Sequence, residues 1–159
     1  MEEKDLTTNT FIETAFEMSE GDGVDVNRLF PVSKERMNFD PFVLWDNFNL
    51  GPDRGFPTHP HRGFEAITYM FTGSIEHKDN LGNHSTVRAG GAQRFTDGRG
   101  MEHSEMPDSK EMSNGIQLWI NLAKNKKTME PSYQQVDEEN IPLIKIEGGS
   151  IRVIVGDES

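Results

Sequence analysis

The sequence predicts an all-β protein of a single domain, folded as a β-sandwich or a β-barrel. The chain has 159 residues, a length that fits one domain and can bury a hydrophobic core without disulfides. Short runs rich in Val, Ile, Thr, Phe and Tyr alternate with turn residues, and the fifteen glycines and eight prolines are spread along the chain. Helical periodicity is scarce, so we expect about ten short strands separated by turns.

The first third of the chain predicts three strands. TFIETAFEM, residues 10–18, is expected to form the first strand, and VDVNRLF, with apolar Val24 and Val26, the second, which Pro31 ends. The apolar run at 41–48 is long enough for a buried strand and too short for a helix. Residues 49–58 hold two prolines and two glycines and are expected to form a loop.

The middle of the chain predicts a series of hairpins. Gly73 lies at a corner, the composition of 79–83 is that of a hairpin turn, and 97–100 is expected to be a loop. The strands expected around these turns are residues 65–71, 74–78, 84–87 and 92–96.

The last part of the chain predicts two strands and a long connection. IQLWINL, residues 116–122, is a strong strand candidate, and 151–155 is expected to be the last strand. Residues 123–140 are polar and contain a proline, so we expect an exposed connection there.

Composition excludes several classes of function. Acidic residues outnumber basic ones by 27 to 16, and the resulting net charge of −11 repels nucleic-acid phosphates and anionic membranes. The chain contains no cysteine, so neither a disulfide nor a thiolate-metal site can form. No apolar run reaches about 18 residues, and MEEKDLTTNTF at the start lacks the features of a secretory signal. We therefore expect a cytoplasmic protein, or a nuclear one in a eukaryote, that binds neither nucleic acid nor membranes.

Two short clusters carry the residue types of a metal site. His59 and His61 are two residues apart, as are His103 and Glu105, and residues i and i+2 of a strand point to the same face. Two strand edges facing each other across a barrel would present three imidazoles and a carboxylate to one ion. This set suits a divalent transition metal such as Fe, Mn, Co, Ni, Cu or Zn, with positions left open for substrate or dioxygen. The alternative is that these are solvated loop histidines.

Glu65 is a rival to Glu105 as the carboxylate of the site. It has the same parity as His61 if the strand is unbroken, whereas a bulge at Gly63 would turn it away. The residue pattern alone leaves both carboxylates open.

The remaining polar and aromatic candidates are assigned to other roles. His77 and His84 flank the hairpin turn and are expected at the surface or behind the ligands, and Asp97 and Glu102 are expected to be solvated or structural. Several aromatic residues are expected in the core, where some could line a cavity for a flat aromatic ligand. These are Phe42, Trp45, Phe64, Tyr69, Phe71 and Trp119.

Longer stretches of the chain resemble the pirin family of the cupin superfamily. They are FPTHPHRGFEAITYMFTGSIEHKDNLGN, GRGMEHSEMP, GIQLWINL and KKTMEPSYQ, with NRLFP and DPFVLWDNF upstream. The resemblance extends from about Val24 to Val155 and implies a cupin β-barrel, which is a jelly-roll-like sandwich.

The resemblance also implies a ligand set. Pirins hold one metal, usually Fe(II), through three histidines and a glutamate, and the matching motifs place these ligands at His59, His61, His103 and Glu105. In cupins generally, the glutamate at the position of Glu65 often binds the metal. In pirins the glutamate that follows the histidine of the second motif does so, and the resemblance therefore favours Glu105. The chain departs from the family at Asp97, where an alanine is common, and this extra acid is expected to alter metal preference and redox potential.

The length of the chain is the larger departure from the family. Pirins usually have two facing barrels, so residues 21–159 are expected to be the N-terminal barrel alone, preceded by a segment, 1–20, that includes the first strand. The surface that would face the absent second barrel is expected to be bare and apolar. Such a surface would favour a homodimer or a protein partner.

The resemblance implies two functions. The first is quercetin 2,3-dioxygenase-like activity, in which a flavonol chelates the metal, Glu105 or Glu65 accepts its proton, and ring opening by dioxygen expels carbon monoxide. The second is a non-enzymatic, iron-dependent redox sensor that regulates a transcription factor. A metal-binding half-protein without activity is the third alternative.

Overall fold

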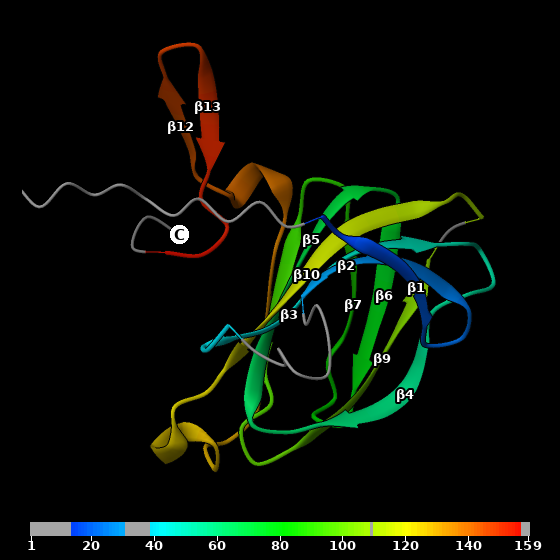
Figure 1. Ribbon diagram of the computed structural model, residues 1–159, viewed down its shortest axis with the longest axis vertical. Helices are drawn as coiled ribbons and strands as arrows, with labels where there is room; N and C mark the ends of the chain where they lie inside the picture. Colours follow the sequence, from blue (N-terminus) through cyan, green and yellow to red (C-terminus); the bar gives the residue numbers. More distant parts are fainter. Residues whose placement is uncertain (1–13, 31–38, 109, 157–159) are drawn as a thin grey trace, which may run out of the picture.

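The computed structural model describes residues 14–30, 39–108 and 110–156. Across these residues the chain forms β-strands and two short 3-10 helices, Lys124–Lys126 and Glu138–Asn140. The strands group into sheets of seven, four and two (Figure 1). Within the same residues, no helix is long and apolar enough to cross a membrane. The predicted all-β class is therefore confirmed.

The larger sheet contains seven antiparallel strands in the order β1-β2-β3-β10-β5-β8-β11. Their bounds are β1 Phe16–Glu20, β2 Val24–Phe30, β3 Phe42–Leu50, β10 Ser113–Asn121, β5 Phe64–Thr72, β8 Ala92–Thr96 and β11 Ser132–Val136.

The smaller sheet contains four antiparallel strands in the order β4-β9-β6-β7. Their bounds are β4 Phe56–His61, β9 Met101–Pro107, β6 Ser74–Asp79 and β7 His84–Arg88. Ile75 of β6 and Val87 of β7 belong to the same buried cluster as Val24, Phe48 and Met70 of the larger sheet. The two sheets therefore pack face to face around one interior, which Figure 1 shows as the body of the barrel.

Three rows of side chains cross the inner face of the larger sheet in direct register. The first apolar row is Val26, Phe48, Gly115 and Met70. The middle row, called the polar row below, is Arg28, Asp46, Gln117, Thr68, Gln93 and Gln135. The second apolar row is Leu44, Trp119, Ala66, Phe95 and Tyr133. The polar row thus separates the two apolar core clusters of the barrel.

Most predicted strands are present, but the polar stretch 123–140 is not simply an exposed connection. It contains β11, which pairs with β8 and buries part of Tyr133 and Val136. The prediction was wrong because alternating polar residues can cover a sheet edge without an apolar run to mark them. The loop predicted at 49–58 is also shorter, since β3 continues to Leu50 and β4 begins at Phe56.

Both ends of the described chain differ from the predicted strands. The first strand was predicted at residues 10–18, of which 10–13 lie outside the described residues, and β1 continues to Glu20. The last strand was predicted at 151–155, whereas β13 (Gly149–Arg152) ends earlier and pairs with β12 (Leu143–Ile146). Figure 1 shows this hairpin standing away from the two larger sheets.

Three of the aromatic residues predicted for the core lie at the surface. Phe42, Trp45 and Phe71 are 41%, 38% and 49% exposed, because they point outward from strands whose other face lines the interior. Phe64 and Trp119 stack on each other with ring centroids 4.3 Å apart and pack against the second core cluster. The outer face of the larger sheet is therefore also rich in apolar side chains.

Candidate metal centre

The histidines of the two motifs lie on neighbouring strands. β4 and β9 pair antiparallel, with His59 directly opposite His103. The expectation that the two strands face each other across the barrel was wrong, because they are hydrogen-bonded neighbours in one sheet. Direct pairing still brings the three imidazoles together, and ligand atoms of His59, His61 and His103 all lie within 4.8 Å of one another. At this spacing one ion can lie between three nitrogens.

The position of β4 explains how its sequence can present two histidines. β4 forms an edge of the smaller sheet, where prolines such as those at 57 and 60, which have no backbone N–H to donate, are tolerated. The carbonyl of Pro57 lies 2.7 Å from Nδ1 of His59 and accepts its hydrogen bond. This contact keeps the proton on Nδ1 and leaves Nε2 as the atom that can bind a metal.

His103 gives the clearest indication that this group of histidines is a metal site. Its side chain is 1% exposed, and neither ring nitrogen has a hydrogen-bond partner among the described residues. A buried imidazole without partners is unfavourable unless an ion occupies the site. Burial, followed by the neighbouring histidines, lowers the pKa of His103 to about 2, and burial and His59 lower that of His61 to about 4. Both rings are therefore neutral at pH 7, which is the form that binds metals.

Glu105 lies on the same inward face of β9 as His103 and is 3% exposed. Its carboxylate accepts hydrogen bonds from Gln93 Nε2 at 2.5 Å and Gln117 Nε2 at 3.0 Å. Burial raises the pKa of Glu105 to about 7, although both amide contacts lower it. The close group of three ligand atoms does not include this carboxylate, so its role as a fourth ligand stays a prediction.

Glu65 is not brought to the histidines. On β5 the residues that face the interior are Ala66, Thr68 and Met70, so Glu65 faces the other side of the sheet. Thr96 Oγ1 donates a hydrogen bond to its carboxylate at 2.7 Å, and Arg94 Nε lies 4.0 Å away. The strand breaks between β4 and β5, where Gly63 has a φ of +82°. Of the two rival carboxylates, only Glu105 is near the site.

A cavity of about 640 Å³ opens beside the histidines. His59, His61 and Glu105 line one part of it, and Phe56, Gln117 and Trp119 line another. The Trp119 ring lies edge-on to His61 with centroids 5.1 Å apart. The cavity therefore offers apolar and aromatic walls next to the group of imidazoles, which suits a flat ligand of moderate size.

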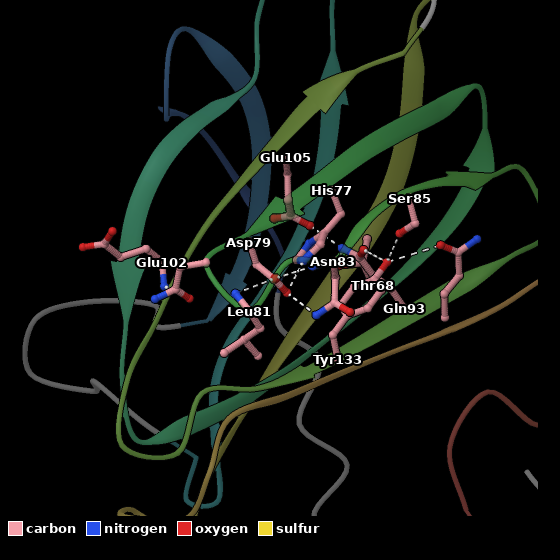
Figure 2. Close-up of polar contacts among 12 residues, drawn as sticks. Thr68, His77, Asp79, Leu81, Asn83, Ser85, Gln93, Glu102, Glu105 and Tyr133 are labelled. Atoms are coloured by element: carbon pink, nitrogen blue, oxygen red, sulfur yellow. Dashed lines mark hydrogen bonds and ion pairs between the residues drawn. The ribbon is translucent and has the colours of Figure 1, made fainter.

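For two further residues the structure decides between the alternatives that the sequence left open: His77 lies behind the ligands and not at the surface, and Asp97 is buried and not solvated. His77 is fully buried, stacks on Tyr133 with centroids 4.1 Å apart, and lies 3.2 Å from Asp79 through Nε2 (Figure 2). Asp97 is also fully buried, whereas His84 and Glu102 are exposed, as expected for solvated residues.

Sequence reasoning missed the two glutamines that contact Glu105. Gln93 and Gln117 occupy inward positions of the predicted strands AQRFT and IQLWINL, next to apolar residues of the same face. A long amide at an inward position is the signal that could have marked them, because a buried amide needs hydrogen-bond partners.

Comparison with known proteins places this geometry in context. The family model described as Pirin matches residues 23–120. "Pirin-like protein 2" of Arabidopsis thaliana is 46% identical over 138 residues, which cover 87% of this chain and 42% of that protein. The chain spans about half the length of the curated relatives it matches.

Solved structures give the same result for the fold. A quercetin 2,3-dioxygenase from Acinetobacter baumannii aligns with a TM-score of 0.79 and 33% identity, covering 91% of this chain and 55% of that one. A bacterial pirin from Escherichia coli in complex with nickel(II) aligns with a TM-score of 0.70 and 27% identity, covering 82% and 57%. The predicted cupin barrel is confirmed.

Proposed function

Because the chain belongs to the pirin family, we propose that it is a metal-dependent dioxygenase of the quercetin 2,3-dioxygenase type, acting on a flavonol-like substrate. The observation that carries the proposal is the convergence of His59, His61 and His103 within 4.8 Å at one side of a large cavity. The similarity to the quercetin 2,3-dioxygenase from Acinetobacter baumannii supports the substrate class. Iron(II) is the proposed metal, with manganese, nickel, cobalt, copper and zinc as alternatives.

Different residues of the chain would bind the metal, hold the substrate and accept its proton. A divalent ion, when bound, supplies a Lewis acid and a place for dioxygen to react. His59, His61 and His103 would hold it in the neutral imidazole form. Trp119 and Phe56 would hold the flat rings of the substrate against the cavity wall. Glu105, whose pKa is raised to about 7 by burial, would take the proton of the substrate hydroxyl.

A single substitution tests the metal centre. We expect His61→Ala to lose most of its bound metal, because one of three imidazole ligands is removed, and to lose dioxygen uptake with quercetin. Elemental analysis and an oxygen electrode measure both. His84→Ala is the matched control, since His84 is exposed and bonded only to Glu76 among the described residues.

The possible results distinguish an error in the ligand assignment from an error in the proposed activity. A His61→Ala protein with full metal content would contradict the ligand assignment. A wild-type protein that binds metal and consumes no dioxygen with a panel of flavonols would contradict the enzymatic function and leave the metal centre intact.

The second candidate is an iron-dependent regulator that binds a protein partner such as a transcription factor. The observation that favours it is the apolar outer surface, with Phe42, Trp45 and Phe71 all exposed. Capture of a partner that depends on the oxidation state of the iron, without dioxygen uptake, would support this function in place of catalysis.

A further inference from the structure

We propose that Gln93 and Gln117 are positioning residues that clamp the Glu105 carboxylate between two amides, and that Tyr133 and Trp119 fix the direction of each amide. The inference rests on the proposed metal centre, toward which the clamped carboxylate would be held. These residues lie on β8, β10 and β11 of the larger sheet, and the clamp joins these three strands to β9 of the smaller one.

The Gln117 side of the clamp has only one workable orientation. The Trp119 indole Nε1, which can only donate, lies 2.8 Å from Gln117 Oε1. The amide oxygen must therefore face Trp119, and Nε2 must face Glu105 Oε2 at 3.0 Å. A flipped amide would set two donors against each other and the amide oxygen against a carboxylate.

The Gln93 side repeats this arrangement with a tyrosine (Figure 2). Gln93 Nε2 donates to Glu105 Oε1, and Gln93 Oε1 accepts from the Tyr133 hydroxyl at 3.0 Å. Ser85 Oγ lies 2.7 Å from the same hydroxyl and can donate to it, so the phenol proton is free for Gln93. Tyr133 is itself held in place by its stacking on His77.

The register of the sheet makes the clamp symmetrical. Gln117, Thr68 and Gln93 are direct cross-strand neighbours in the polar row. Thr68 Oγ1 lies between the two amides, 3.1 Å from Gln117 Nε2 and 3.4 Å from Gln93 Nε2. Thr68 and Gln93 are 0% and 2% exposed, so water does not compete for the contact between them, whereas Gln117 is partly buried and lines the cavity.

The clamp leaves the carboxylate free to bind an ion. The two carboxylate oxygens together have about four lone-pair directions. The two amides and the Thr68 hydroxyl use three of them, so one direction remains for an ion while these contacts stop the side chain from rotating. A carboxylate that is already fixed loses less conformational entropy when it binds a metal. Loss of such hydrogen-bond partners commonly weakens metal affinity by about 10- to 100-fold.

Cobalt(II) titration of the full chain tests the clamp. We expect Gln93→Leu and Gln117→Leu to weaken cobalt binding by about tenfold or more and to change its visible ligand-field spectrum, which reports the ligand set. Tyr133→Phe, which removes one oxygen and keeps the ring on His77, is expected to act in the same direction with a smaller effect.

Gln134→Leu is the matched control, because it makes the same change at an exposed position of β11. It is expected to keep the wild-type affinity and spectrum. If either leucine variant fails to fold, as judged by circular dichroism, Tyr133→Phe carries the test.

The results distinguish failure of the clamp from failure of the metal centre. Folded clamp variants with wild-type affinity and spectrum would overturn the clamp, provided that His61→Ala abolishes cobalt binding. Wild-type protein that does not bind cobalt, or His61→Ala protein that binds it unchanged, would overturn the metal centre itself.

Discussion

Asp97 is a buried carboxylate with no hydrogen-bond partner for either oxygen among the described residues, and its side chain is 0% exposed. Burial, followed by the charges of Glu105 and Glu65, raises the pKa of Asp97 to about 7 from its usual 3.8. The folded protein therefore favours the protonated acid, and ionisation destabilises it.

We expect Asp97→Asn to stabilise the metal-free protein at pH 8. Because the folded pKa is raised, the wild-type free energy of unfolding falls as pH rises from about 4 to about 7. The neutral amide avoids this loss, so its advantage should grow over the same window to about 2–4 kcal/mol and vanish near pH 4.

Urea denaturation at pH 4, 6 and 8 measures the effect. Glu102→Gln removes an exposed acid from the next strand and is the control. A gain that is equal at all three pH values would show that the benefit of Asp97→Asn does not come from its charge.

At the residue scale the histidines could be predicted and their partners could not. The spacing of His59, His61 and His103 indicates a metal site because i and i+2 share one face of a strand. The contacts of Glu105 depend on which strands pair and in which register, and the sequence does not contain that information in local form. For the same reason the sequence left open whether His77 lies at the surface or behind the ligands, since Tyr133, which stacks on it, comes from the distant strand β11.

At the scale of the elements, Gly73 is the residue that connects the two sheets. β5 ends at Thr72 in the larger sheet and β6 begins at Ser74 in the smaller one, so one residue makes the crossing. Its φ is +67°, and a Cβ there would overlap Ser113 Oγ and lie 2.8 Å from Ser113 Cα. Ser113 is buried and bonds both the backbone N–H and the carbonyl of Ser74.

We expect Gly73→Ala to reduce the free energy of unfolding by about 2–4 kcal/mol, from a strained backbone and an overpacked joint. Gly82→Ala is the matched control, because Gly82 also has a positive φ, +94°, but no atom within 4 Å of the added Cβ. Chemical denaturation compares the two variants. Equal losses in both would show that the joint tolerates a methyl group.

The elements that could be predicted are those marked by apolar runs and turn residues. Gly73 and the turn at 79–83 were identified because glycine and a polar cluster mark a corner. β11 was missed because SYQQV places only one aromatic side chain, Tyr133, on its inward face, too little to distinguish the segment from a loop.

At the scale of the whole molecule, the β12–β13 hairpin has one apolar face. Ile144 pairs with Ile151, and Ile146 with Gly149, on one side, while Lys145 pairs with Ser150 on the other. Ile144 is 41% exposed, Ile151 48% and Ile146 51%. Exposed apolar area of this kind commonly mediates association.

We expect the wild-type chain to self-associate in a concentration-dependent way, with the paired substitution Ile144→Lys and Ile151→Lys shifting it toward monomer. Sedimentation velocity over a range of concentrations measures this. The control, Ser150→Lys, adds charge on the opposite face of the hairpin. A wild-type protein that is monomeric at every concentration would contradict the expectation.

β10 has a consequence for how the sheet finds its register. Its inward residues include Gly115 and Gln117, while its outward residues Ile116, Leu118 and Ile120 line an apolar groove on the far face. A slip of one residue would exchange the two sets and bury more hydrocarbon, yet it would remove the amide from Glu105. The hydrogen bond to Glu105 thus favours the observed register, and burial of the isoleucines and the leucine favours the shifted one. If another surface covered the outer face of β10, burial would no longer favour the shifted register, and the strand would be protected against misfolding.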